Sequence, residues 1–525
     1  MNKIIKMSRY CVVAASMAML FSSCSKYLDV NSNPNGPEVV DPALYLSSIQ
    51  ANYALGMQFD ARMLGPYVQN FHHITTSLST STGTNNADIH GYVRSSDFGG
   101  DLWRNVYWKG GFNTLDLIKQ AKEQKKWDLL GVGYVMQALG WQWLTDYHGE
   151  IILREAFNEN QNTFKYDSQE VVYKYVDSLT RAGIAELQKT SDGVGSSLFG
   201  RFDLIYKGDR NRWIKFAWGL LALQHQHLSR KSTGYNPDSV IAYVDRSFAN
   251  NADDAMVPFL GQASTDANFF GPLRNNLPNF GQSAFIVRLT DGTLFTGAID
   301  PRRPVYLTTS TDGMYRGLQP GVGQASQTAA TSVRSLFNTQ LGLTSSQPAG
   351  TVGKYLFQNN APFPIMTYSQ LQFVKAEAAF IKGDKQLART AYLNGLNASL
   401  DFVRSYATDV LAYNTARTTY MTNPAIVPPT AADLTLSQIM LQKYISQWCW
   451  GFLETWCDLR KYDYDANVFT TFTLPSTYFV DNNGKPAYRI RPRYNSEYIW
   501  NIDALTAIGG FDIDYHTKKM WIHQQ

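Results

Sequence analysis

The feature that most constrains the fold is a set of apolar stripes at helical spacing that occur in adjacent pairs. The clearest pair covers residues 369–382 and, after a turn at Gly383-Asp384, residues 385–402. Apolar residues three and four positions apart share one face of an α-helix. Neither helix of such a pair can bury its stripe alone, so the pattern predicts helical hairpins that pack against one another.

Further helices are predicted along the chain. Asp41-Pro42 offers a cap residue followed by proline at the first helical position, and Asp167 and Glu170 have the spacing of a capping box. Hairpins of roughly 34–40 residues resemble tetratricopeptide units. The predicted fold class is all-α, with tetratricopeptide-like helical hairpins and long irregular loop insertions. The other segments expected to be helical are 41–63, 102–118, 128–147, 167–187, 211–229 and 435–460.

Three stretches interrupt the helical pattern. Residues 70–100 are rich in Ser, Thr, Gly and Asn, and a loop of this length is usually functional or disordered. Residues about 255–365 and 466–525 are also loop-rich, with short strands possible around Phe472 and Tyr488. We expect these insertions to cover one face of the helical frame, where binding residues are commonly found, and not to fold separately.

The N-terminus has the layout of a secretory signal. Basic residues precede an apolar run that ends in Ser22-Ser23-Cys24, and the run is shorter than the ~20 residues of a membrane span. A cysteine after small residues resembles a bacterial lipobox, in which Cys24 would carry the lipid. The alternative is an ordinary signal cleaved nearby, with Cys24 incidental. The lipobox predicts a signal peptide at 1–23, a lipidated tether at 24–40 and a folded body at 41–525.

Charge and cysteine content limit the possible partners and cross-links. The formal net charge is +4, and three of the basic residues leave with the signal, so no nucleic-acid partner is predicted. Cys449 and Cys457 are eight positions apart in a predicted helix, a rise of ~12 Å. A disulfide requires Cα atoms within ~7 Å, so we expect none between them. After the signal no apolar run approaches a membrane span, which leaves the lipid as the expected anchor.

Aromatic side chains beside the polar loops are the best candidates for ligand contact. Aromatic residues make up 14% of the chain, and sugar sites combine a few rings with a few planar polar groups. The spacing of Trp103 and Tyr107 favours packing inside the first hairpin, whereas Trp108 is freer to face solvent. The candidate ligand-binding residues are His72, His73, Tyr92, Arg94, Asp97, Trp103 and Trp108 near the first loop, and Phe270, Asn279, Phe280, Tyr315 and Arg316 in the 255–365 insertion.

No residue pattern indicates metal or catalytic chemistry. Adjacent histidines such as His72 and His73 usually diverge, and no carboxylate or cysteine lies near them at ligand spacing. His225 and His227 point about 200° apart on a predicted helix and cannot share an ion. We therefore predict no metal, no cofactor and no catalytic residue. Three acidic residues on helices rich in Lys or Arg are expected to form structural ion pairs: Glu377, Glu454 and Asp458.

Short motifs spread over nearly the whole mature chain suggest a family. They include Cys24-Ser-Lys-Tyr-Leu-Asp-Val-Asn31, Asp146-Tyr-His-Gly149, Tyr206-Lys-Gly-Asp209, Met366-Thr-Tyr368, Gln442-Lys443-Tyr444, Glu454-Thr-Trp456-Cys-Asp458-Leu-Arg460 and Arg491-Pro-Arg493-Tyr494-Asn-Ser-Glu497. Each motif is weak alone. In this order, behind a lipobox, they resemble the SusD/RagB nutrient-binding outer-membrane lipoproteins, and in particular their second large subgroup.

The resemblance implies a role in nutrient uptake. It implies a lipid-anchored protein of the outer membrane, facing the cell exterior, that captures an oligosaccharide and delivers it to a TonB-dependent transporter of the SusC type. It implies no catalysis. Three alternatives stay open: capture of peptides by the same architecture, a surface glycan hydrolase, and a structural lid for the transporter without ligand binding of its own.

Overall fold

The structure is a computed structural model that describes residues 40–74, 84–94, 99–190, 193, 195, 197–324, 330–337 and 351–524. The signal peptide, Cys24 and Asp97 lie outside the described residues, as does all of the tether except its last residue. The folded body is one unit, Pro42–Gln525, and is described here by itself.

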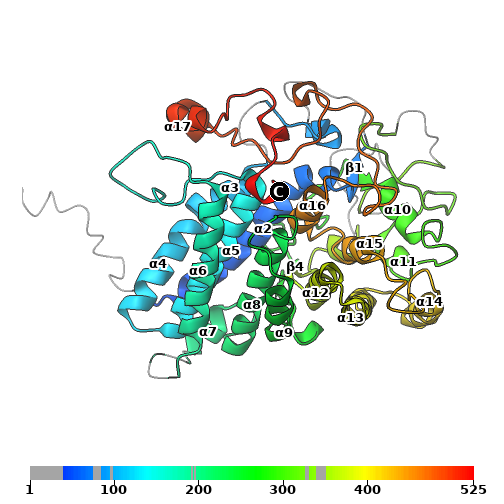
Figure 1. Cartoon of the computed structure of the whole chain (residues 1–525), viewed down its shortest axis with the longest axis horizontal. Helices are drawn as coiled ribbons and strands as arrows, with labels where there is room; N and C mark the ends of the chain where they lie inside the picture. The colour runs from blue at the N-terminus through cyan, green and yellow to red at the C-terminus, as the bar shows by residue number, and fades with distance from the viewer. Residues whose placement is uncertain are drawn as a thin grey trace, which may run out of the picture. The chain divides into compact units, whose positions relative to one another are not determined.

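The first helices form the hairpin expected from the sequence (Figure 1). Helix α2 extends past the predicted end at residue 63, with Pro66 in its last turn, and its N-cap is Pro42 and not Asp41. A π-helical turn, η2 (Asn105–Lys109), joins α3 (Asp101–Arg104) to α4 (Gly111–Glu123). The elements are α2 (Ala43–Tyr67), α3 (Asp101–Arg104), η2 (Asn105–Lys109), α4 (Gly111–Glu123) and α5 (Trp127–His148).

The next helices continue the stack, and α4, α5, α6, α8 and α9 lie side by side in Figure 1. The predicted capping box at Asp167 is wrong, because the Ser168 side chain caps α6 by accepting from the Val171 N–H. The Asp167 carboxylate instead accepts the main-chain N–H groups of Leu153 and Arg154, which fixes the preceding turn. These helices are α6 (Gln169–Leu187), α7 (Ser197–Phe202), α8 (Arg210–His227) and α9 (Pro237–Arg246).

The predicted hairpin at 369–402 is confirmed as α12 (Tyr368–Lys382) and α13 (Lys385–Arg404). Gly383 ends α12 at a φ of 89°, a conformation that favours glycine, and Asp384 caps α13. The predicted continuous helix at 435–460 is wrong. The helix is divided near Cys449, whose φ is 63°. Cys449 and Cys457 are both buried free thiols. The remaining helices are α14 (Val410–Thr422), α15 (Leu436–Ser446), α16 (Phe452–Lys461) and α17 (Ile502–Ala507).

Two short antiparallel strand pairs hold the insertions. Strand β1 (Phe71–His73) pairs with β3 (Phe280–Gln282), and β2 (Ala255–Val257) pairs with β4 (Phe363–Met366). In the part of the chain that the structure describes, no strand occurs around Phe472 or Tyr488, so those strand predictions are wrong. The short helices are α10 (Ala284–Thr290), α11 (Arg303–Tyr306), η1 (Thr84–Ile89), η3 (Asn251–Asp253), η4 (Tyr355–Phe357), η5 (Val480–Asn482), η6 (Ser496–Trp500), η7 (Tyr515–Thr517) and η8 (Trp521–His523).

One apolar core joins the helices and the insertions. Trp213 and Trp456 are fully buried in it, and Phe270, Phe280 and Phe472 from the insertions belong to the same cluster. Burying apolar area of this kind is the main favourable term in folding. The insertions are therefore packed onto the helical frame. Among the described residues, no helix is long and apolar enough to cross a membrane.

Buried ion pairs connect the later helices. Lys461 lies 2.6 Å from Glu377 and 3.2 Å from Asp458, and Lys443 lies 2.8 Å from Asp458. His227 lies 3.0 Å from Glu454. The prediction that Glu377, Glu454 and Asp458 form structural ion pairs is confirmed.

Candidate functional site

His72 and His73 lie inside the molecule on β1. Their exposed fractions are 0% and 5%, and their Nδ1 atoms lie 3.3 and 3.2 Å from one carboxylate oxygen of Asp88. Burial opposes the charge of Asp88, but the two imidazoles outweigh it and lower the pKa of its carboxyl. The sequence analysis found no carboxylate near these histidines, because Asp88 reaches them through the η1 turn. Both side chains are buried against Asp88 and offer no surface to a ligand.

Three of the predicted aromatic contacts are also core residues. Trp103, Phe270 and Phe280 are 6%, 0% and 5% exposed. Trp103 packs 4.6 Å from Tyr107 between ring centroids, as its helical spacing favoured, and Phe280 packs 4.1 Å from His73. Because their ring faces are covered by other side chains, these residues cannot lie against a sugar ring and are left out of the site below.

Tyr92 and Arg94 converge on Asp481, a residue that the sequence analysis did not single out. The Tyr92 hydroxyl donates to Asp481 Oδ2 at 2.7 Å, and Arg94 Nε donates to the same oxygen at 3.0 Å. Burial and the Asp481 carboxylate, opposed by the nearby Arg491 guanidinium, raise the pKa of Tyr92 to about 12. The Arg94 side chain is 42% exposed while Asp481 is covered, so the guanidinium forms the outer layer of this cluster.

The C-terminal insertion adds aromatic rings to this cluster. The Arg493 guanidinium lies 4.2 Å from the Tyr498 ring centroid and donates from Nε to the main-chain oxygen of Arg94 at 3.1 Å. Trp500, two residues after Tyr498 on η6, is 72% exposed. We call this surface the loop face; it consists of Tyr92, Arg94, Asp481, Arg493 and Tyr498, and the exposed Trp500, which ends the same π-helical turn as Tyr498, is counted with it.

The other exposed candidates belong to the 255–365 insertion and to η2. Ile74, at the end of β1, donates its N–H to the Asn279 carbonyl, so the first loop and this insertion are joined. Arg316 pairs with Asp312 at 2.7 Å, and Tyr315 lies under the Arg303 guanidinium, 4.1 Å from its ring centroid. These groups are partly exposed and can make polar contacts at the edge of a site.

Trp108 is 63% exposed, as expected from its position just after the polar loop at 70–100. Its π-helical turn contacts α2, α4 and α5, which belong to the helical frame. Among the described residues, the exposed indoles are Trp108 on the frame and Trp500 on η6.

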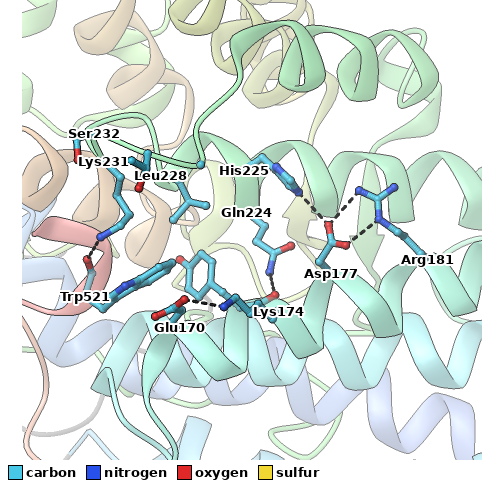
Figure 2. Close-up of a pocket in the computed structure, with 13 residues that line it drawn as sticks. Glu170, Lys174, Asp177, Arg181, Gln224, His225, Leu228, Lys231, Ser232 and Trp521 are labelled. Carbon is cyan, nitrogen blue, oxygen red and sulfur yellow. Dashed lines mark hydrogen bonds and ion pairs between the residues drawn. The ribbon is translucent and has the colours of Figure 1, made fainter. Parts of the chain in front are cut away.

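A cavity of about 630 Å³ opens between α6 and α8 (Figure 2). It is closed at one end by the loop at 231–234 and by Trp521 of η8. A second hollow of about 420 Å³ lies between the segment around Pro304 and α14. Neither can be predicted from the sequence, since each is lined by residues distant in the chain.

One buried cluster has side chains of the kinds that bind metals: Asp146, His227 and Cys457. Both imidazole nitrogens of His227 face carboxylates, Asp146 at 3.3 Å and Glu454 at 3.0 Å. Burial lowers the pKa of His227, but the two carboxylates outweigh it and raise the pKa to about 10. In this arrangement the imidazolium is an ion-pair partner of both carboxylates, and a metal ion would have to displace its proton in order to bind.

A comparison with models of known protein families identifies the family of this chain. A SusD-like family model, described as "Starch-binding associating with outer membrane", matches residues 34–491. The chain belongs to this family. The resemblance predicted from the sequence motifs is therefore confirmed. A search of curated proteins finds no match.

Solved SusD-like structures share the fold over nearly the whole chain. A SusD/RagB family protein from Bacteroides thetaiotaomicron is 20% identical with a TM-score of 0.67, covering 92% of this chain and 99% of its own. A SusD homologue from Bacteroides fragilis is 16% identical with a TM-score of 0.69, covering 93% and 100%. A chitin-binding SusD homologue from Flavobacterium johnsoniae is 19% identical with a TM-score of 0.67, covering 91% and 99%.

Membership of the SusD-like family confirms the predicted all-α, tetratricopeptide-like fold. It also places the chain among glycan-binding proteins that associate with the outer membrane. The protein is a binding protein and not an enzyme, as the sequence analysis predicted.

Proposed function

We propose that this SusD-like protein captures oligosaccharides on its loop face and passes them to a TonB-dependent transporter of the SusC type in the outer membrane. The observation that carries the proposal is the match of the starch-binding family model to residues 34–491. The chitin-binding function named for the Flavobacterium johnsoniae homologue supports a glycan ligand of this general class.

The loop face has the chemistry that sugar capture needs. Trp500 offers a large exposed ring on which the apolar C–H face of a sugar can lie. The guanidinium groups of Arg94 and Arg493 supply planar donors to hydroxyl oxygens. Because Asp481 and Tyr498 hold these two side chains in place, little side-chain entropy is lost when a ligand binds.

The adjoining polar groups Asn279, Tyr315 and Arg316 are proposed to extend the site along the ligand. The Arg316 guanidinium is held by Asp312, and the Tyr315 ring is held by Arg303, so both are positioned before a ligand arrives. Two further residues stay candidates: Asp97, which lies outside the described residues, and Trp108, the exposed indole of the frame.

Attachment to the membrane is proposed to run through lipid on Cys24, with the body facing the cell exterior. A single acyl chain gives only marginal binding, whereas the several chains of a bacterial lipoprotein give a stable anchor. A glycan held by the anchored protein would have a high effective concentration at the mouth of a neighbouring transporter, even at modest affinity.

The ligand is tested by affinity electrophoresis of the mature chain in gels that contain starch or chitin, followed by calorimetry with oligosaccharides. We expect retardation by at least one polysaccharide, with no release of product from it. Binding of peptides without binding of glycans would favour the peptide alternative. Release of sugar would contradict the assignment as a binding protein.

The anchor is tested by Cys24→Ala in the producing cell. We expect the variant to leave the membrane fraction, because no other anchor is proposed, while Cys457→Ala at a buried thiol stays in that fraction. Firm attachment of the Cys24→Ala protein would contradict the lipid assignment.

A further inference from the structure

The C-terminal insertion carries a group of exposed apolar side chains. Ile499, Ile502, Phe511 and Ile513 are 43–58% exposed, and all four belong to one stretch of fifteen residues. We call these four side chains the apolar ridge. Exposed apolar residues that occur singly are ordinary, whereas a group of them on one surface is typical of a site that contacts another molecule. The apolar ridge is therefore a candidate interaction surface.

Contacts of Tyr498 bring the two parts of the ridge together. The Tyr498 ring, on η6, meets the Phe511 ring edge-on with the centroids 4.9 Å apart, and its hydroxyl donates to the main-chain oxygen of Gly510 at 3.1 Å. The Arg491 guanidinium donates to the same hydroxyl at 3.0 Å and to the main-chain oxygen of Ile513 at 2.8 Å. The turn that carries Phe511 and Ile513 therefore lies against η6.

Buried side chains hold the ridge in place from below. Asn501 is 2% exposed, and its Nδ2 donates to Glu497 Oε2 at 2.8 Å and to the main-chain oxygen of Phe164 at 2.9 Å. Leu505 of α17 is fully buried, although α17 lies at the outer edge of the molecule in Figure 1. A surface that is ordered before contact loses little conformational entropy when a partner docks.

The ridge is poor in charge, and the charges beside it are mainly acidic. Residues 498–511 contain one charged side chain, Asp503, and depletion of charge among aromatic and aliphatic residues is typical of the centre of a protein interface. The next seven residues add two aspartates and Lys518, which pairs with Asp512. Segments that lie on a membrane usually combine apolar residues with Lys and Arg. These charges therefore favour a protein partner with basic groups over a lipid surface.

The ridge continues the loop face. Tyr498 lies 4.2 Å from the Arg493 guanidinium, and Arg493 Nε donates to the main-chain oxygen of Arg94. In the proposed function a glycan passes from the loop face to the transporter, so the loop face has to be directed toward the transporter. A surface that borders the loop face on the same insertion then meets the transporter beside the glycan.

We propose that the apolar ridge docks on the extracellular side of the TonB-dependent transporter. The facing loops of the transporter supply apolar side chains for Ile502 and Ile513, and Lys or Arg groups for the aspartates beside them. The identity of the partner rests on the proposed function, whereas the position of the contact rests on the ridge and its charges. Trp500 stays with the glycan on the loop face.

The test uses the full chain in the producing cell, with an affinity tag after Gln525 and the combined change Ile502→Glu and Ile513→Glu. The TonB-dependent transporter recovered with the protein from detergent-solubilised outer membranes is identified and quantified by mass spectrometry. We expect its recovery to fall about tenfold, because docking would bury two unpaired carboxylates. Val410→Glu with Leu411→Glu is the matched control, since both side chains are exposed on α14 of the frame.

Two further measurements separate loss of the contact from misfolding. The melting temperature of the ridge variant and its retardation by polysaccharides should equal those of the unaltered protein. A photo-reactive benzoylphenylalanine at position 502 should cross-link to the transporter, and the same group at position 411 should not. A lower melting temperature or lost retardation would overturn the docking role, because the ridge would then serve the fold or the glycan site.

The remaining outcomes distinguish the ridge from the partnership itself. If the unaltered protein recovers no TonB-dependent transporter, the partnership in the proposed function fails, and the docking role fails with it. If the transporter is recovered equally well with the ridge variant, the docking role alone is overturned. A cross-link from position 502 to a second copy of this chain, or to lipid in place of the transporter, also overturns it.

Discussion

The helical frame and the loop face use the same kinds of residue with opposite exposure. In the frame, Asp458 and its partners Lys443 and Lys461 are nearly inaccessible. On the loop face, the Arg94 side chain that pairs with Asp481 is 42% exposed. A charge removed from water must stay paired, whereas a surface pair contributes little to stability. Equivalent substitutions should therefore affect folding in one region and ligand binding in the other.

The tryptophans show the same contrast. Trp456 is fully buried, with the Arg460 guanidinium 3.7 Å from its ring centroid. Trp500, at the end of the π-helical turn η6, is 72% exposed. An exposed ring buries little apolar area, so removing it should leave the stability of the fold nearly unchanged.

The largest effect is expected from Asp458→Ala. This change takes from the buried Lys443 the carboxylate with which it pairs and leaves Lys461 with Glu377, and losing one partner of a buried pair costs about 3–5 kcal/mol. The free energy of unfolding is measured by chemical denaturation. The matched change on the loop face, Asp481→Ala, should lower the free energy of unfolding far less. Similar losses of unfolding free energy in both variants would contradict the expected difference between the helical frame and the loop face.

The second largest effect is a dependence of stability on pH through His227. Its pKa is raised from about 6.5 in the unfolded chain to about 10 in the fold. The stability that the imidazolium contributes is therefore complete below pH 6.5 and is lost as the pH rises through 10. We expect the difference in unfolding free energy between the unaltered protein and His227→Gln to shrink by a few kcal/mol over this range.

Unfolding at pH 6, 8 and 10 measures this difference. His225→Gln is the control, because His225 is partly exposed and pairs with Asp177 at the cavity surface. A His227→Gln difference that stays constant from pH 6 to pH 10 would contradict the raised pKa.

How far the sequence predicts the structure depends on how local the determining contacts are. The hairpin of α12 and α13 follows from residues three and four positions apart and from the Gly383-Asp384 turn, so it was predicted almost to the residue. The break near Cys449 was missed, because the apolar pattern continues through it. The three-dimensional contact that fixes it is the hydrogen bond from the Cys449 N–H to Asn70, far away in the chain.

The loop face could not be predicted from the sequence either, because its residues come from distant parts of the chain. The sequence points to Tyr92 and Arg94 because they belong to the polar loop at 70–100, but their partner Asp481 lies 389 and 387 residues away. Trp500 follows the family motif that ends at Glu497, and the apolar run at 498–500 in a polar insertion was the available signal. Phe270 and Phe280 were chosen by the same reasoning, yet the β1–β3 pairing and the apolar core bury them.

A smaller effect, on binding alone, is expected from Trp500→Ala. Loss of one stacked ring should weaken glycan binding about tenfold, or about 1.4 kcal/mol, with almost no change in melting temperature. Trp108→Ala removes an equally exposed indole from the frame, and Trp456→Ala removes a buried one that should lower stability. Weaker binding in Trp108→Ala with unchanged binding in Trp500→Ala would move the site to the frame.

The smallest effect is expected from Arg94→Lys. The substitution keeps the positive charge near Asp481 but removes the planar guanidinium that donates from Nε, so stability should change by less than about 1 kcal/mol. Binding should fall severalfold, because a single ammonium cannot both hold Asp481 and present a flat edge to sugar hydroxyls. Calorimetry beside Arg417→Lys, an arginine of α14 paired with Asp401, measures the difference. Equal affinities in the two variants would show that Arg94 serves only to fasten Asp481, and the ligand contacts would then fall to Trp500 and Arg493.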